Sequence, residues 1–389
     1  MITEKLKVLN YELKGELPNP FIFDDGKIVK TKSDWEKRRK EMYKSTIDLQ
    51  FGTMPPKPEF LDIEPLYVGN GNPYSYKITT GTKASPVTFV MYVFRANLKK
   101  KAPVVISGDM CFPYYYNLDY LKAFSDNGID LVLFNRCELA PDIAYYNLVK
   151  LIDGTYDKQL SESVFEGLTK NGPGGQLKKA YPNYTFGTIG AWAWGYSRCV
   201  DALEKLGYTD MSCVAFTGHS RGGKTSALAG AIDERATIVH ANSTCAGGYS
   251  GYRINIEAET QSGNIAKSED IAHIFEIFPS WMGSELRNYI NKEELLPFDS
   301  HYLKAMVAPR VLLVTEASSD IMGNSVGSYQ TTEAALEVYK FLDVEKNLYW
   351  HFRDGSHYLM LEDLKALINL IKHLREGEPL NENFYTRPF

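Results

Sequence analysis

The spacing of hydrophobic and polar residues changes character at about residue 100. Before it, residues 74–79 and 87–94 alternate between the two kinds, which is typical of antiparallel strands with one solvated face. After it, residues 102–108 and 129–134 are continuous apolar runs, as expected of parallel strands buried on both faces. A helix-like segment, residues 117–125, separates these two runs.

Strand and helix patterns then alternate to the carboxyl end. We predict strands at residues 213–217, 237–242, 310–315 and 347–352, and helices at residues 188–206, 221–231, 328–342 and 361–375. Alternating strands and helices behind a set of antiparallel strands are the layout of an α/β-hydrolase. The expected fold is therefore an α/β three-layer sandwich with a mostly parallel central sheet.

The first sixty residues are polar and punctuated by proline, and we interpret them as an N-terminal extension. A charged helix is predicted within them, with Ser33 as its N-cap and Glu36 completing a capping box. No internal repeat, low-complexity segment or Gly/Ser-rich linker interrupts the chain. We therefore expect residues 1–389 to form a single catalytic domain whose N-terminal extension covers about residues 1–60.

The turn between the strand at 213–217 and the helix at 221–231 reads Gly-His-Ser-Arg-Gly. This Gly-x-Ser-x-Gly pattern between a strand and a helix is typical of a nucleophile elbow, which presents Ser220 at the top of a parallel sheet. Gly218 and Gly222 are needed because side chains at those positions would collide across the turn. The pattern predicts that Ser220 is a nucleophile.

A serine nucleophile needs a base and a carboxylate that orients the base, and in this fold they follow the serine in the order acid, then histidine. His357 lies in the loop after the last predicted strand, where the base belongs. Three other late histidines are expected to be packing or structural residues: His301, His351 and His373. The acid should follow the strand at 310–315, and Asp320 is preferred there, with Glu316 as the alternative.

The start of the helix after Ser220 is expected to stabilise an oxyanion. Donors are predicted to be the backbone N–H of Arg221 and the loop at residues 108–113, and the Arg221 guanidinium could also reach the charge. Lys224 follows one helical turn after Ser220, on the same face, where it could contact substrate hydroxyl or carboxylate groups.

Composition narrows the possible partners. The net charge of −5 and the lack of a long basic stretch argue against a nucleic-acid partner, and no apolar run is long enough for a membrane span. The five cysteines are scattered without a Cys-x-x-Cys pair, which predicts no metal site and favours reduced thiols in the cytoplasm. No signal peptide is visible, although a secreted chain trimmed of its signal would look the same. The oligomeric state is left open.

Several motifs together resemble the glucuronoyl esterases, carbohydrate esterase family 15. Residues 218–224, Gly-His-Ser-Arg-Gly-Gly-Lys, resemble that family's Gly-Cys-Ser-Arg-x-Gly-Lys motif. The likeness continues over most of the chain, in residues 17–26, 35–39, 190–198, 278–281, 296–301 and 308–310.

The resemblance implies a serine esterase that needs no cofactor or metal. Its substrate would be a carbohydrate ester, between 4-O-methyl-glucuronic acid on xylan and a lignin alcohol. Ser220 would be the nucleophile, His357 the base and Arg221 the oxyanion stabiliser. The positions that resemble the family's sugar-binding residues are Lys224, Gln261 and Glu269.

Two departures from the family pattern bear on the assignment. Many members carry a catalytic glutamate after the strand that follows the elbow helix, but residues 242–248 here contain no carboxylate. Bacterial relatives often place the acid in the later loop, so the chain resembles the bacterial type and Asp320 is favoured. In that loop Met322 stands where a tryptophan is expected.

Two alternatives stay open beside a glucuronoyl esterase. One is a xylan acetyl esterase or general carboxylesterase on the same scaffold, which the methionine at 322 leaves possible. The other is a carbohydrate-binding relative that has lost catalysis, and the intact Ser, His and late-loop acid argue against it.

Overall fold

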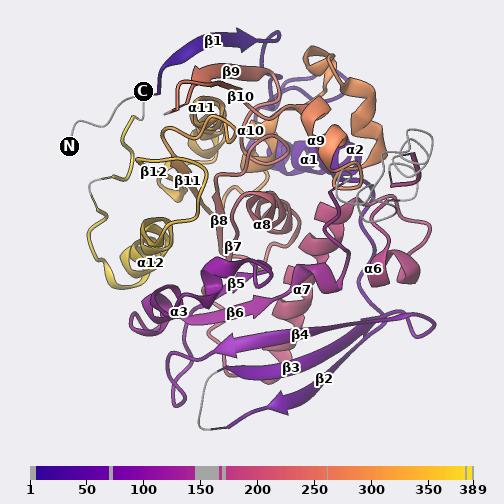
Figure 1. Cartoon of the computed structure of the whole chain (residues 1–389), viewed down its shortest axis with the longest axis vertical. Helices are drawn as coiled ribbons and strands as arrows, with labels where there is room; N and C mark the ends of the chain where they lie inside the picture. Colours follow the sequence, from indigo (N-terminus) through magenta and orange to yellow (C-terminus); the bar gives the residue numbers. More distant parts are fainter. Residues whose placement is uncertain are drawn as a thin grey trace.

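The computed structural model of the chain describes residues 6–69, 73–144, 166–168, 172–260, 262–381 and 383–387. Through its centre runs a nine-stranded sheet in the order β12-β11-β8-β7-β5-β6-β4-β3-β2 (Figure 1). The strands are β2 (Phe60–Tyr67), β3 (Tyr74–Gly81), β4 (Pro86–Phe94), β5 (Val104–Ser107), β6 (Asp130–Phe134), β7 (Val214–Thr217), β8 (Ile238–Asn242), β11 (Val311–Ala317) and β12 (Leu348–Arg353).

The sheet changes from antiparallel to parallel at β6. Strands β2, β3, β4 and β6 pair antiparallel, whereas β6, β5, β7, β8, β11 and β12 pair in parallel. A mostly parallel sheet between helical layers confirms the predicted α/β-hydrolase fold class.

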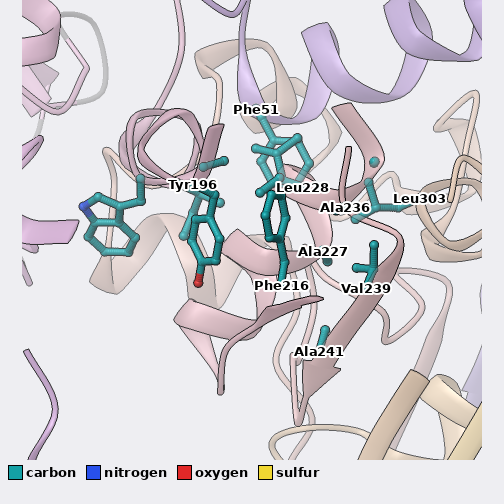
Figure 2. Close-up of a cluster of buried hydrophobic side chains, with 14 of the residues drawn as sticks. Phe51, Tyr196, Phe216, Ala227, Leu228, Ala236, Val239, Ala241 and Leu303 are labelled. Carbon is teal, nitrogen blue, oxygen red and sulfur yellow. The ribbon is translucent and has the colours of Figure 1, made fainter. Parts of the chain in front are cut away.

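Helices cover both faces of this sheet, because alternate residues of each buried strand point to opposite sides. Val104 and Ile106 of β5 join the larger hydrophobic core, and Val105 joins the smaller one. The larger core packs under four helices, α7 (Thr188–Leu206), α8 (Arg221–Ile232), α10 (Ser300–Ala305) and α11 (Ser325–Phe341). The smaller core packs under α3 (Leu118–Ser125) and α12 (Leu361–Glu376). Figure 2 shows part of the larger core, where the ring centroids of Tyr196 in α7 and Phe216 in β7 lie 5.1 Å apart.

The longer α-helices keep close to their predicted bounds, whereas four short ones, α2, α6, α9 and α10, were not predicted. The α-helices of the described residues are α1 (Lys32–Met42), α2 (Leu49–Phe51), α3 (Leu118–Ser125), α6 (Gly175–Ala180), α7 (Thr188–Leu206), α8 (Arg221–Ile232), α9 (Ile271–Ile277), α10 (Ser300–Ala305), α11 (Ser325–Phe341) and α12 (Leu361–Glu376). Helix α11 begins earlier than the predicted residue 328, because the Asn324 side chain accepts a hydrogen bond from the Gly327 N–H and caps it there. A π-helical turn (Tyr43–Asp48) joins α1 to α2, and short 3-10 turns lie at Pro113–Tyr116, Arg136–Glu138, Ser284–Tyr289, Glu293–Leu295 and Glu345–Asn347.

The N-terminal residues contribute to two parts of the structure. Strand β1 (Val8–Leu13) pairs antiparallel with β9 (Ile254–Glu259), which also pairs with β10 (Ile265–Lys267) in a separate three-stranded sheet. Helix α1 buries Trp35 and Met42 in the larger hydrophobic core. The predicted extension is thus packed against the rest of the chain.

The predicted cap of the first helix was wrong. Thr31, not Ser33, is the N-cap, and its capping box is completed by Asp34 rather than Glu36. Both hydroxyl residues are followed three positions later by a carboxylate, so the local pattern fits either register. The extended backbone of Thr31, at φ −130° and ψ 160°, places the boundary two residues earlier.

A substitution at Gly230 tests how tightly helix α8, which follows Ser220, packs on β8. A glycine-to-alanine change inside a helix normally adds about 0.5–1 kcal/mol of stability. At Gly230, however, the new Cβ would collide with both methyl groups of buried Val239, and overpacking costs about 1–3 kcal/mol. Gly230→Ala should therefore lower the free energy of unfolding by about 1–2 kcal/mol in denaturant titration. Gly167→Ala is the control, because its Cβ would meet no atom of the described residues within 4 Å, and an equal loss of stability there would contradict this explanation.

Candidate active site

Ser220 sits on a strained turn between β7 and α8, as the elbow pattern predicts. Its backbone has φ 56° and ψ −122°, a conformation that a non-glycine residue rarely adopts. A Cβ on Gly218 would collide with the Gly222 carbonyl, and a Cβ on Gly222 would collide with the Asp109 carboxylate. Glycine is therefore required at both positions to bring the chain past Ser220.

The structure brings Ser220, His357 and Asp320 together from three separate loops. His357 Nε2 lies 2.9 Å from Ser220 Oγ, and His357 Nδ1 lies 2.7 Å from Asp320 Oδ2. A carboxylate accepts only, so we assign the imidazole hydrogen to Nδ1, which leaves Nε2 to accept from the serine hydroxyl. Asp320 is 1% exposed, and its other oxygen accepts the Gly323 N–H at 2.7 Å.

Glu316, the alternative acid, lies in a different environment. It is the second-to-last residue of β11, its side chain is fully buried, and its Oε1 accepts from the Ser328 hydroxyl at 2.8 Å. Burial, and then the nearby Asp320 carboxylate, raise the pKa of Glu316 to about 8. A carboxyl that keeps its proton at neutral pH and faces Ser328 is poorly placed to orient His357.

A buried ion pair that the sequence did not reveal fixes the loop after β5 against the elbow. Asp109 pairs with Arg136, and both side chains are almost completely buried. The same carboxylate accepts the His219 backbone N–H at 2.9 Å and the Tyr114 hydroxyl at 2.5 Å. Burial lowers the pKa of Arg136 to about 10, so the guanidinium still carries its charge at neutral pH. Asp109 stands two residues after β5, at the carboxyl end of a buried strand, but no pattern in the sequence shows that it pairs with Arg136.

Arg221 is held at the mouth of the site by an acidic residue and aromatic rings. Its Nη1 donates to Asp142 Oδ2 at 2.8 Å, and the other oxygen of Asp142 accepts from Trp281 Nε1 at 3.1 Å. The guanidinium carbon lies 4.8 Å from the ring centroids of both Trp281 and Phe278, which stack on each other. Asp142 thus orients Arg221, a role that sequence reasoning missed.

The expected oxyanion donors differ in availability. In the loop at residues 108–113, the backbone N–H groups of Gly108, Asp109, Met110 and Phe112 all bond within the protein. The Arg221 N–H, at the first turn of α8, has no protein acceptor among the described residues. The Cys111 N–H likewise has no acceptor among the described residues, so the first turn of α8 and Cys111 are the two sources of a free backbone donor.

Two of the three predicted sugar-binding residues form a buried ion pair. Lys224 Nζ lies 2.7 Å from Glu269 Oε2, and the two side chains are 1% and 6% exposed. The Glu269 N–H donates to the Met322 carbonyl at 3.1 Å, which ties this pair to the loop that carries Asp320. Gln261 lies outside the described residues.

A cavity of about 620 Å³ opens beside Ser220, and neither Lys224 nor Glu269 is among its lining residues. Its walls are mostly aromatic and apolar, with Met322, which is 39% exposed, at its edge. The lining residues are Phe112, Pro113, Tyr114, Asn117, Tyr120, His219, Ser220, Arg221, Met322, His357, Tyr358 and Leu359.

Within the part of the chain that the structure describes, no three or more His, Cys, Asp or Glu side chains are grouped so that they could hold a metal ion. None of the described helices has the length and apolar character to cross a membrane.

Comparison with known proteins points to one group of esterases. Residues 162–343 match the family model described as glucuronyl esterase, fungi. The 4-O-methyl-glucuronoyl methylesterase 1 of Wolfiporia cocos is 25% identical over 337 residues, which are 84% of this chain and 72% of the relative.

Solved structures agree with this sequence comparison. A carbohydrate esterase family 15 glucuronoyl esterase from Caldicellulosiruptor kristjansonii matches with a TM-score of 0.79 and 26% identity, over 96% of this chain and 94% of that one. A mutant glucuronoyl esterase from Sporotrichum thermophile, in complex with methyl 4-O-methyl-beta-D-glucopyranuronate, has a TM-score of 0.71 and 21% identity over 98% and 92% of the two chains. At that identity the second match supports the fold alone.

The raised pKa of Glu316 predicts a pH dependence of stability. The folded chain keeps a proton that the unfolded chain releases near 4.5, so stability from Glu316 is fully present below that pH and is lost as the pH rises to about 8. Glu316→Gln should flatten the fall in unfolding free energy over this range by up to about 1 kcal/mol per pH unit. Denaturant titrations at several pH values measure this dependence of the unfolding free energy on pH. The exposed Glu345→Gln change is the control, and an unaltered slope in Glu316→Gln would disprove the assignment.

Proposed function

Because the comparisons support membership of the glucuronoyl esterase family, carbohydrate esterase family 15, we propose that this chain is a serine esterase that hydrolyses 4-O-methyl-glucuronoyl esters. One observation carries the proposal: His357 lies within hydrogen-bond distance of both Ser220 Oγ and Asp320. Lys224, one helical turn after Ser220, and its buried partner Glu269 support a polar, sugar-like acyl group.

In the proposed reaction Ser220 Oγ attacks the ester carbonyl while His357 Nε2 takes the hydroxyl proton. Asp320 holds the imidazole in the tautomer that leaves Nε2 free, and it stabilises the imidazolium that forms. The negative charge on the former carbonyl oxygen is met by the Arg221 N–H and by the guanidinium that Asp142 orients. His357 then passes its proton to the departing alcohol.

A water molecule completes the cycle by attacking the acyl-enzyme. His357 removes a proton from this water and returns it to Ser220 Oγ, which releases the glucuronic acid and restores the enzyme. The donors at the start of α8 act in both halves of the reaction, because each passes through a tetrahedral oxyanion.

Lys224 and Glu269 are proposed to bind hydroxyl groups of the glucuronoyl ring. Each has spare hydrogen-bonding capacity after forming the ion pair, since an ammonium has three donors and a carboxylate two acceptor oxygens. Gln261 is proposed as a third sugar contact by resemblance alone.

The position of the acid supports the bacterial type within the family. Asp320 comes from the loop after β11, and its Oδ2 lies 2.7 Å from His357 Nδ1. A cytoplasmic location and a single catalytic domain over the whole chain stay predictions.

One observation favours a second candidate activity, a xylan acetyl esterase or general carboxylesterase. Met322 is 39% exposed at the edge of the cavity, at the position where a tryptophan is expected. A flexible thioether would accept varied acyl groups more readily than an indole ring would.

Ser220→Ala should lower kcat/KM for methyl 4-O-methyl-glucuronate by at least about 10⁴-fold, because no other group can form the acyl-enzyme. The wild type should prefer benzyl and methyl glucuronate esters to acetyl-xylan and aryl acetates in initial-rate assays. Ser284→Ala, at an exposed serine, is the control. Faster turnover of acetates would favour the second activity, and full activity of Ser220→Ala would exclude the mechanism.

Asp320→Asn and Glu316→Gln separate the two candidate acids. Asp320→Asn should lower kcat by about 10³–10⁴-fold, because an amide cannot stabilise the imidazolium or enforce the tautomer. Glu316→Gln should change kcat less than about 10-fold, since the wild-type group is neutral and faces Ser328. Steady-state kinetics at neutral pH measure both losses of kcat. A larger loss in Glu316→Gln than in Asp320→Asn would assign the catalytic acid to Glu316.

A further inference from the structure

A hydrogen-bond chain beneath the elbow fixes the orientation of the Asn242 side chain. Asn242 Nδ2 lies 3.2 Å from the Thr315 backbone carbonyl and 2.8 Å from the Thr315 hydroxyl. A carbonyl oxygen only accepts hydrogen bonds, so the nitrogen of the amide must face Thr315. The amide oxygen of Asn242 therefore faces the other way, toward His219.

This orientation determines the tautomer of His219. Its Nδ1 lies 2.5 Å from Asn242 Oδ1, an acceptor, so Nδ1 must carry the hydrogen. Burial, and then the neighbouring His357, lower the pKa of His219 to about 3, so the ring is neutral at physiological pH. His219 Nε2 is thus unprotonated and can only accept a hydrogen bond.

His219 Nε2 has no hydrogen-bond partner among the described residues, and this nitrogen is not fully buried. The residue is 8% exposed and lines the cavity beside Ser220. Two other polar groups in the wall already have partners, since the Tyr114 hydroxyl donates to Asp109 and the Tyr120 hydroxyl donates to the Leu359 carbonyl. The free nitrogen of His219 therefore stands as an acceptor in a mostly apolar wall.

The position of His219 relates it to the leaving alcohol. His357 must protonate the alcohol oxygen, so that oxygen lies within hydrogen-bond reach of His357 Nε2. The ring centroids of His219 and His357 are 5.0 Å apart. A hydroxyl group on the alcohol, two or three bonds from the ester oxygen, would therefore reach His219. The apolar body of the alcohol would occupy the rest of the cavity.

We propose that His219 is a specificity-determining residue that accepts a hydrogen bond, at Nε2, from a second hydroxyl group on the alcohol part of the ester. The preferred alcohol then has an apolar body and a hydroxyl close to the esterified carbon. This proposal deepens the proposed function and rests on it.

Two esters of 4-O-methyl-glucuronic acid that differ by one hydroxyl test the proposal. These are the 2-phenylethyl ester and the 2-hydroxy-2-phenylethyl ester. In the wild type kcat/KM should be about fivefold higher for the hydroxylated ester, the size expected of one neutral hydrogen bond. In His219→Phe the ratio should fall to about one, because the ring is kept and the acceptor is lost. His273→Phe, at an exposed histidine outside the cavity lining, should keep the wild-type ratio.

A second variant and a spectroscopic measurement guard against misfolding. His219→Cys also removes the acceptor and introduces the residue that the related motif carries, so it should give the same ratio as His219→Phe. Nitrogen-15 NMR of histidine-labelled wild type should show His219 with a protonated Nδ1 and a bare Nε2 at neutral pH. An Nε2–H tautomer, or an unchanged ratio in either variant, would overturn the proposal. Failure of the wild type to hydrolyse even the methyl ester would instead overturn the proposed function, and with it this inference.

Discussion

The active site depends on one close approach of the backbone, between the residues before and after Ser220. This approach leaves no space for a side chain at Gly218 or Gly222. The approach is tolerated because surrounding bonds over-determine it. The Ser220 N–H donates to the Asn242 carbonyl at 2.9 Å, and the next N–H back, from His219, donates to buried Asp109. The nucleophile, the start of α8 and the cavity wall all take their positions from this turn.

Charged side chains around the turn lie in three pairs, of which two are buried and one, Asp142 with Arg221, is partly exposed. Asp109 pairs with Arg136 beside the turn. Asp142 pairs with Arg221, the residue after Ser220. Glu269 pairs with Lys224, one helical turn after Ser220. Breaking a buried pair by removing one partner costs about 3–5 kcal/mol, so such pairs hold side chains in place even where they add little net stability. The two carboxyl groups near the end of β11, Asp320 and Glu316, differ in partner and in protonation state. Asp320 faces His357, while burial keeps Glu316 protonated at neutral pH.

The sequence was informative wherever the signal was local or set by strand order. The fold class and the bounds of α7 could be predicted from the hydrophobic pattern. The convergence of Ser220, His357 and Asp320 could also be predicted, because the carboxyl ends of parallel strands meet at one edge of a sheet. The N-cap at Thr31 could not be chosen, since Ser33 offers the same spacing to a carboxylate. Asp109, Asp142 and the tautomer of His219 could not be seen either. Each depends on which side chains from distant segments meet, and no pattern along the chain records that.

The claim that Ser220 attacks a glucuronoyl ester is tested most directly by competition at that residue. The wild type is treated with a fluorophosphonate, with and without saturating methyl 4-O-methyl-glucuronate, and the modified peptide is identified by mass spectrometry. The account predicts one adduct, on Ser220, whose rate of formation falls in the presence of the glucuronate ester but is unaffected by methyl acetate at the same concentration. An adduct on another residue, or labelling of Ser220 that the glucuronate ester does not slow, would contradict it.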